Sequence, residues 1–185
     1  MIYEEKTIDS EIVYEGKLVR VRRDHVTVRK GTAVREIVEH PGGVAMCVLT
    51  PEGNVVMERQ YRYAFGRAAY EVPAGKLEEG EDPAEAARRE VREETGYRAG
   101  SVRFLTRAIP SVGFCTEVLS FYLCTDLVRG ETDWDPDEMI ELEERPIEDL
   151  YQAILRGEID DGKTVIAVLM TMALIREGEL EGYLK

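Results

Sequence analysis

A short segment near the middle of the chain places three carboxylates where they can share one ligand. Glu90, Glu93 and Glu94 are spaced i, i+3 and i+4 in a stretch with helical character, so their side chains lie on one face. Such a face is stable when solvent, arginines or cations neutralise it. Mg²⁺ prefers oxygen ligands and bridges carboxylates to phosphates, and Arg89 can pair with a carboxylate to orient it. The spacing therefore predicts a divalent-cation site that acts on phosphates.

The loop before this helix favours the same chemistry. Gly75 and Gly80 allow the backbone to approach a neighbouring group closely. The loop lacks the lysine–serine pair of a P-loop and leads into an acidic helix, so cations must mediate any contact with phosphate. The alternative interpretation of the same residues is a solvated, charged helix surface.

The helix that carries these glutamates has clear ends. Asp82 is suited to the N-cap, Pro83 to the first helical position, and Gly96 to the C-terminal stop. The residues expected to face the core at helical spacing are Ala84, Ala87, Val91 and Thr95.

The remaining pattern predicts strands mixed with helices. The first forty residues alternate like a small antiparallel unit with a turn at residues 30–32, and the chain breaks at Pro41-Gly42-Gly43. We expect strands at 44–50, 55–61, 69–72, 102–108 and 118–124, and further helices at 147–156 and 164–175. The fold class indicated is α+β: a layered sandwich of strands and helices (43–185), preceded by a small N-terminal antiparallel β subdomain (1–42).

Composition narrows the possible partners. The net charge of −13 disfavours nucleic acid polymers and anionic membranes as partners. No stretch approaches the roughly 20 apolar residues of a membrane span, and the acidic N-terminus has no apolar signal region, so we expect a cytoplasmic protein. Three cysteines without C-x-x-C spacing and two isolated histidines disfavour a disulfide framework or a zinc site. Any metal should be held by oxygen.

The segment from Gly75 to Tyr97 resembles the signature of the Nudix hydrolases, G-x5-E-x7-R-E-U-x-E-E-x-G-U with U aliphatic. Tyr97 departs from it at the last U position, which packs against apolar surface. The residues that match are Gly75, Glu81, Arg89, Glu90, Val91, Glu93, Glu94 and Gly96. The resemblance implies a Nudix fold, an α/β/α sandwich with a mixed β-sheet. It also implies a Mg²⁺-dependent hydrolase, with Mn²⁺ as a substitute.

Other segments resemble the ADP-ribose pyrophosphatases of that family. These are the lead-in Glu71–Gly75, the strand Arg59–Arg62, the loop Pro110–Glu117 and the N-terminal strands; Val112 replaces a proline of the loop. The resemblance implies metal ligation by the Ala74 carbonyl and by Glu90, Glu93 and Glu94, with catalytic roles for Arg89 and Glu93. The substrate-binding residues it implies are Arg59, Arg62, Glu71 and Glu117.

An acidic segment, residues 131–144, is by default a solvated loop. Within it, Asp137–Leu142 resembles the loop that supplies a catalytic glutamate in ADP-ribose pyrophosphatases. Glu138 is the candidate base, and Glu141 is the alternative.

The reaction expected from these residues is hydrolysis of a phosphoanhydride, with ADP-ribose giving AMP and ribose 5-phosphate. The alternatives are another small-molecule substrate (GDP-mannose, NADH or a diadenosine polyphosphate) or a nucleotide-sensing Nudix module. An isomerase of this family would need a catalytic cysteine and extra histidines, which fits poorly. The N-terminal strands are too short to bury a core of their own, and in relatives they form a swapped dimer, so we expect a homodimer.

Overall fold

The computed structural model describes residues 2–134 and 139–185, which cluster into two units. One unit combines Met1–Gly42 with Ile109–Val118, and the other combines Gly43–Ala108 with Leu119–Lys185. The sequence pattern placed residues 109–118 with the second unit. They join the first because the Val38 amide donates to the Phe114 carbonyl (2.7 Å) and the Thr116 amide donates to the Val38 carbonyl (3.0 Å).

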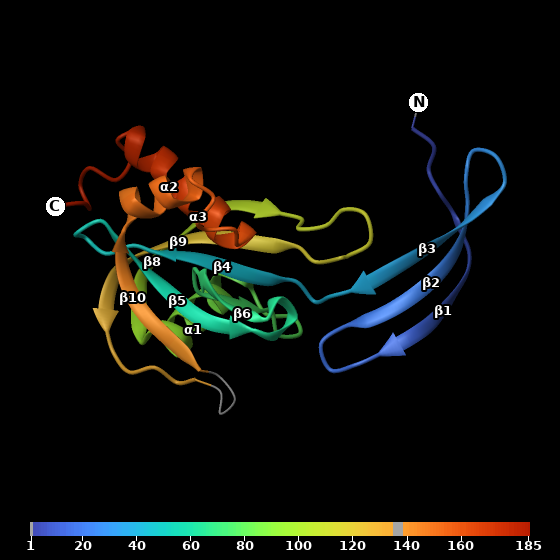
Figure 1. Ribbon diagram of the computed structural model, residues 1–185, viewed down its shortest axis with the longest axis horizontal. Helices are drawn as coiled ribbons and strands as arrows, with labels where there is room; N and C mark the ends of the chain where they lie inside the picture. Colours follow the sequence, from blue (N-terminus) through green and yellow to red (C-terminus); the bar gives the residue numbers. More distant parts are fainter. Residues whose placement is uncertain (1, 135–138) are drawn as a thin grey trace. The chain divides into compact units, whose positions relative to one another are not determined.

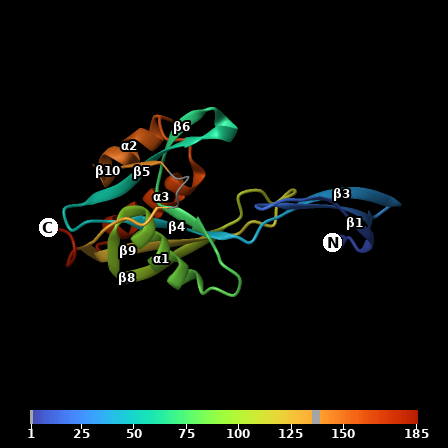
Figure 2. The ribbon, with the colours of Figure 1, turned by 90° about the horizontal axis from the view of Figure 1, so that it is seen from below.

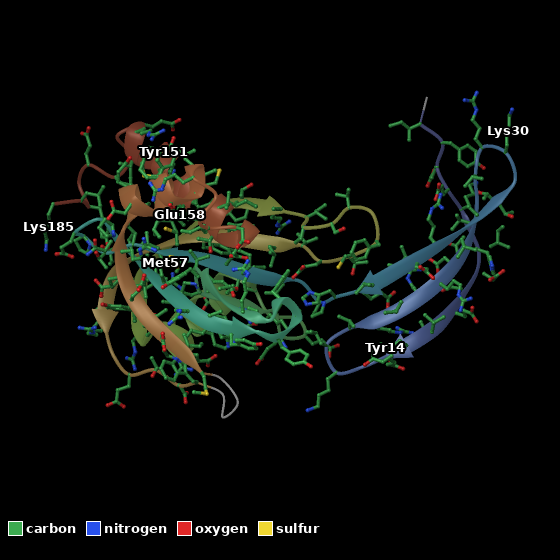
Figure 3. All side chains as sticks on the ribbon, in the orientation of Figure 1. Tyr14, Lys30, Met57, Tyr151, Glu158 and Lys185 are labelled. Atoms are coloured by element: carbon green, nitrogen blue, oxygen red, sulfur yellow. The ribbon has the colours of Figure 1, made fainter. Side chains whose placement is uncertain are left out.

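The N-terminal unit is built on an antiparallel sheet in the order β1-β2-β3. Its strands are β1 (Thr7–Glu15), β2 (Arg20–Thr27) and β3 (Thr32–Glu39). The expected turn between β2 and β3 is present, with Gly31 at φ +93°; Lys30 of this turn and Tyr14 of β1 are labelled in Figure 3. Every residue of β1 is exposed, so this sheet has little core of its own.

The second unit contains two sheets, with strand orders β10-β5-β6 and β7-β4-β9-β8. Strands β4 and β9 run parallel and the other paired strands run antiparallel, so the four-stranded sheet is mixed. The elements are β4 (Gly43–Val48), β5 (Asn54–Arg62), the 3₁₀ turn η1 (Tyr63–Phe65), β6 (Arg67–Glu71), β7 (Ala74–Lys76), α1 (Pro83–Thr95), β8 (Tyr97–Ala108), β9 (Leu119–Arg129), β10 (Ile140–Pro146), α2 (Ile147–Leu155) and α3 (Gly162–Arg176).

Strand β4 separates two apolar layers of this unit. Val44, Met46 and Val48 pack with α1, whereas Ala45 and Cys47 point to the opposite layer with α2 and α3. Figures 1 and 2 show α1 on one side of these strands and α2 and α3 on the other. Both faces of β4 are buried, which explains its nearly continuous apolar sequence. The predicted α/β/α sandwich is confirmed.

Helix α1 has the ends that its sequence predicts. The Asp82 side chain accepts hydrogen bonds from the amides of Ala84 and Glu85, and Pro83 is the first helical residue. Gly96 ends the helix at φ +71°, a conformation that glycine adopts without strain. The buried residues on the helix are Ala86, Ala87, Val91, Glu94 and Thr95.

The acidic segment is not a loop throughout, as its charge suggested. Residues Ile140–Pro146 form β10, which pairs antiparallel with β5 in a register that sets Ile140 opposite Gln60. Ile140 is buried, while the three glutamates of the strand (Glu141, Glu143 and Glu144) are exposed. Because β10 is an edge strand, its glutamates can stay in solvent while its backbone pairs with β5. These charged residues made the sequence look like a loop rather than a strand. Within the described residues, no helix is long and apolar enough to cross a membrane.

Candidate active site

Arg89 joins the loop to the glutamates of helix α1. Its Nε and Nη2 atoms donate to the two carboxylate oxygens of Glu81 (2.8 and 2.9 Å), and its Nη1 donates to Glu90 (2.7 Å) and Glu93 (3.1 Å). Nη2 also donates to the Lys76 carbonyl (3.2 Å). The hydrogen bonds to Glu81 are the main reason that the Arg89 pKa lies far above its ordinary value. The predicted pairing of Arg89 with carboxylates is confirmed.

The backbone of β7 lies directly against the other side of this cluster. Glu94 is buried, and its Oε2 accepts a hydrogen bond from the Ala74 amide at 3.0 Å. A β-carbon on Gly75 would lie 1.9 Å from the Glu90 carboxylate, so only glycine allows this approach. Ala74 and the carboxylates of Glu90 and Glu94 are thus brought together from residues far apart in the chain.

The start of the acidic segment, which its charge predicted to be a solvated loop, holds the end of helix α1. The Asp133 amide donates to the Glu93 carbonyl (2.8 Å), and the Trp134 indole donates to the Glu94 carbonyl (2.7 Å). Arg92 pairs with both Asp133 and Glu93. Helix ends leave carbonyls without partners inside the helix, and these donors satisfy two of them. The sole tryptophan of the chain is therefore an anchor on the helix that bears the glutamates.

Arg59 and Arg62 lie on opposite faces of β5, because successive side chains of a strand alternate. Val56 shares the face of Arg62 and packs in the layer of α1. Met57, labelled in Figure 3, shares the face of Arg59 and packs in the layer of α2 and α3. Arg62 therefore lies on the side of the glutamate cluster, and Arg59 does not.

The contacts of the two arginines agree with this division. Arg62 forms a bidentate pair with the buried Glu71 (2.6 and 2.9 Å), which is the main reason that the Arg62 pKa is raised; the charge of Glu94 also contributes. Arg59 donates to Glu141 (2.9 Å) and lies over the ring of Tyr70, 5.9 Å from its centroid. Glu141 is thus placed on the face away from α1.

Two further residues expected in the site lie outside the described part of the second unit. Glu117 lies in the N-terminal unit, where its carboxylate is 3.6 Å from Nδ1 of His40. Glu138, the candidate base, lies outside the described residues.

Lys163, which sequence reasoning missed, completes the surroundings of Glu71. Its Nζ donates to Glu71 Oε2 (2.9 Å) and to Asp161 Oδ1 (2.8 Å). Asp161 is also the N-cap of α3. The helix at 164–175 was predicted, and the helix-start pattern Asp161-Gly-Lys-Thr could have placed its first residue at Gly162, but nothing in that pattern indicates a partner 92 residues away.

The donor set fits a hard divalent cation. Glutamate oxygens and the backbone of Ala74 are the kinds of ligand that Mg²⁺ and Mn²⁺ prefer. Among residues 2–134 and 139–185, no three acidic, histidine or cysteine side chains already converge on one point. In this structure the carboxylates of Glu90 and Glu93 pair with Arg89 instead, and that of Glu94 accepts from the Ala74 amide. Burial raises the pKa of Cys47 and of Cys124 to about 12, so neither thiol is poised as a nucleophile or a soft-metal ligand.

The half-buried Tyr97 shows why the one departure from the signature is tolerated. Its ring packs against the apolar layer of α1, and its hydroxyl donates to Glu144 at 2.8 Å. The position keeps its apolar contact and sends the polar end of the side chain outward.

Comparisons with known proteins agree with this geometry. The NUDIX domain model matches residues 39–168, so the chain belongs to the Nudix family. It is 41% identical over 170 residues to the methanol dehydrogenase activator of Bacillus methanolicus, covering 90% of this chain and 92% of that protein. It is 39% identical over 168 residues to the ADP-ribose pyrophosphatase of Bacillus subtilis (strain 168), covering 89% of this chain and 91% of that protein. A crystal structure of an ADP compounds hydrolase shares the fold, with a TM-score of 0.83 and 19% identity over 98% of this chain and 97% of that chain.

Proposed function

We propose that this protein is a Mg²⁺-dependent pyrophosphatase that hydrolyses ADP-ribose to AMP and ribose 5-phosphate. The observation that carries the proposal is the complete Nudix cluster, in which Arg89 joins Glu81, Glu90 and Glu93 while Glu94 lies against Ala74. The extensive identity with an ADP-ribose pyrophosphatase supports the choice of substrate.

In this proposal the Ala74 carbonyl and Glu90, Glu93 and Glu94 hold Mg²⁺, with Mn²⁺ as a substitute. The bound cation would neutralise the diphosphate and lower the pKa of an attacking water. Arg89 orients the carboxylates of Glu90 and Glu93, which lie on one face of the helix, by donating to both of them.

We assign different parts of the substrate to the remaining residues. We assign the anionic end of the substrate to Arg62, whose guanidinium is oriented by Glu71 on the face of the glutamate cluster. Arg59 points to the other face, so we assign it to a different part of the ligand. Glu117 and the N-terminal unit would contribute to binding in a homodimer. The base is assigned to Glu138, and the expected location is the cytoplasm.

A second candidate function is activation of an alcohol dehydrogenase. The supporting observation is the 41% identity to the methanol dehydrogenase activator, over 92% of that protein. Adding the chain to the methanol dehydrogenase of Bacillus methanolicus, and measuring the rate of methanol oxidation with and without the chain, tests this role.

The test of the main proposal is a substrate panel with Mg²⁺: ADP-ribose, GDP-mannose, NADH and a diadenosine polyphosphate. We expect ADP-ribose to have the highest kcat/KM, and EDTA to abolish its hydrolysis.

Glu94→Gln should lower turnover by about 100-fold or more, because a catalytic cation contributes several kcal/mol and about 1.4 kcal/mol is a factor of ten. Glu85→Gln on the same helix, whose carboxylate is exposed and pairs only at 3.5 Å with Arg88, is the matched control. Full activity in EDTA would refute the mechanism, and a higher kcat/KM for another member of the panel would refute the substrate.

A further inference from the structure

Glu71 is a buried carboxylate that receives two cations from different parts of the fold. It is the last residue of β6, with 4% of its surface exposed. Its Oε1 accepts from Arg62 Nε at 2.6 Å, and its Oε2 accepts from Arg62 Nη2 and from Lys163 Nζ, both at 2.9 Å. A buried carboxylate with one partner removed is costly, so each cation is needed to keep Glu71 charged and in place.

Lys163 is well suited to this contact. It stands in the first turn of α3, its side chain is 22% exposed, and its ammonium bridges Glu71 and Asp161. Burial alone would lower the Lys163 pKa, but the charges of Asp161 and Glu71 raise it above its ordinary value. The ammonium is therefore a fixed positive charge at neutral pH.

A second connection runs from the same helix end to the residue after Glu71. The Val72 amide donates to Thr164 Oγ1 at 2.9 Å, in a buried bond. Thr164 Oγ1 donates in turn to Asp161 Oδ2 (2.8 Å), whose other oxygen receives Lys163. The start of α3 thus holds both Glu71 and Val72. These are the two residues directly before Pro73-Ala74, where the Ala74 amide donates to Glu94.

We propose that Lys163 is a positioning residue for substrate binding, acting through Glu71 on Arg62. Lys163 holds the Glu71 carboxylate, and Glu71 fixes the plane of the Arg62 guanidinium by a bidentate pair. The Arg62 side chain is 41% exposed and remains accessible to an anionic ligand. The inference rests on the proposed function for the identity of that ligand, the diphosphate of a nucleotide derivative.

The experiment compares steady-state kinetics of the full-length wild type with three variants: Lys163→Met, Glu71→Gln and their combination. Lys163→Met removes the charge and keeps most of the side-chain volume. We expect it to raise KM for ADP-ribose by about tenfold or more, the value of one charge-assisted hydrogen bond, while kcat changes by less than about threefold. Because Lys163 acts through Glu71, adding Lys163→Met to Glu71→Gln should raise KM no further.

Arg67→Gln is the matched control. It removes an exposed ion pair, Arg67–Asp160, that also links the β6 strand to the segment before α3 but does not reach Glu71. Its KM should equal that of the wild type. A wild-type KM in Lys163→Met, or KM effects of Lys163→Met and Glu71→Gln that multiply in the double variant, would overturn the proposal.

A readout without substrate separates this inference from the proposed function. Amide hydrogen exchange of the segment from residue 70 to 76 should be faster in Lys163→Met than in the wild type and in Arg67→Gln. If the wild type hydrolyses no member of the substrate panel, the proposed function fails, and the exchange measurement still decides whether Lys163 holds the segment that contains Glu71. Unchanged exchange in this segment would overturn the positioning role even in an active enzyme.

Discussion

The position of the Glu90 carboxylate depends on the absence of a side chain at Gly75. The absence of a side chain at Gly75 creates the space that the Glu90 carboxylate occupies, and Arg89 then holds that carboxylate from the other side. A rigid first set of ligands is what a cation site needs to work without reorganisation.

Gly75→Ala should therefore displace Glu90 and leave the fold intact. We expect metal affinity or turnover to fall by about 10- to 100-fold, the usual effect of disturbing groups that orient metal ligands. Titration with Mn²⁺ and a thermal melt measure the two quantities separately. Gly182→Ala is the control, because a β-carbon there meets nothing within 4 Å. Equal metal affinity in Gly75→Ala and the wild type would contradict the predicted role of this close approach.

The identity of the base is a second question at residue scale. If Glu138 is the base, Glu138→Gln should lower kcat by roughly 100-fold or more and change KM little, since general-base catalysis contributes that much in the transition state. Glu141→Gln should have a small effect, because Glu141 pairs with Arg59 on the face of β5 away from α1. The reverse pattern in kcat would show that Glu141 is the base, and wild-type rates for both would return the role to the glutamates of α1.

At the scale of elements, the junction between β6 and α3 joins two parts of the second unit that are 92 residues apart in the chain. Glu71, Asp161 and Lys163 meet there as a group of alternating charge, in which Glu71 is buried and the other two are half-buried. Burial alone would raise the pKa of Glu71 and of Asp161, but the hydrogen bonds from Arg62 to Glu71 and the charge of Lys163 on both carboxylates bring the two values below normal.

This charge arrangement predicts how stability depends on pH. Carboxylates with lowered pKa contribute stability above their unfolded values, 4.5 for Glu71 and 3.8 for Asp161, and lose it as the pH falls through the folded values. Lys163, with a raised pKa, contributes below its unfolded value of 10.5 and loses stability only above it. The free energy of unfolding of the wild type should therefore exceed that of Lys163→Met most at pH 7, and the difference should shrink between about pH 4.5 and pH 3.

Urea denaturation of both proteins at pH 7, 5, 4 and 3 measures this difference. Contributions from other carboxylates cancel in it, because both proteins contain them. Arg67→Gln should show a smaller difference at every pH, since its ion pair is exposed. A difference that grows on acidification would contradict the assigned sign.

At the scale of the whole molecule, the N-terminal unit leaves apolar side chains in solvent. Only Asp24 and Val26 of its three strands are buried. The exposed apolar side chains on these strands are Ile8, Ile12, Val13, Tyr14 and Val34. A three-stranded sheet without a covered face is marginal on its own, so a second copy of the chain is the expected cover.

We therefore predict a homodimer at micromolar concentration, measured by sedimentation velocity. Ile12→Asp should shift the protein toward monomer and lower its activity, because it introduces a charge among the apolar side chains that the partner would bury. Leu155→Asp, at an exposed apolar position at the end of α2, should leave the dimer unchanged. A fully active wild-type monomer would contradict this assembly.

The sequence by itself was sufficient to predict the helix that carries the glutamates and the fold class. Local patterns carry that information: the N-cap Asp82, the stop at Gly96, the apolar spacing of Ala87 and Val91, and the i, i+3, i+4 glutamates are all contained within 15 residues. The pairing of Arg89 with its neighbours followed from the same spacing. A buried strand such as β4 was visible because both of its faces are apolar.

Only the tertiary structure decided which distant residues meet. That Arg62 faces the glutamates and Arg59 does not depends on the register of β5 against its neighbours. The edge strand β10 was hidden because an edge can be charged on its exposed positions and still pair through its backbone. Trp134 on the end of α1, and Lys163 on Glu71 across 92 residues, are contacts that no local pattern indicates. Hydrogen bonds and ion pairs depend on distances in space, and those distances are set only when the sheets and helices pack together.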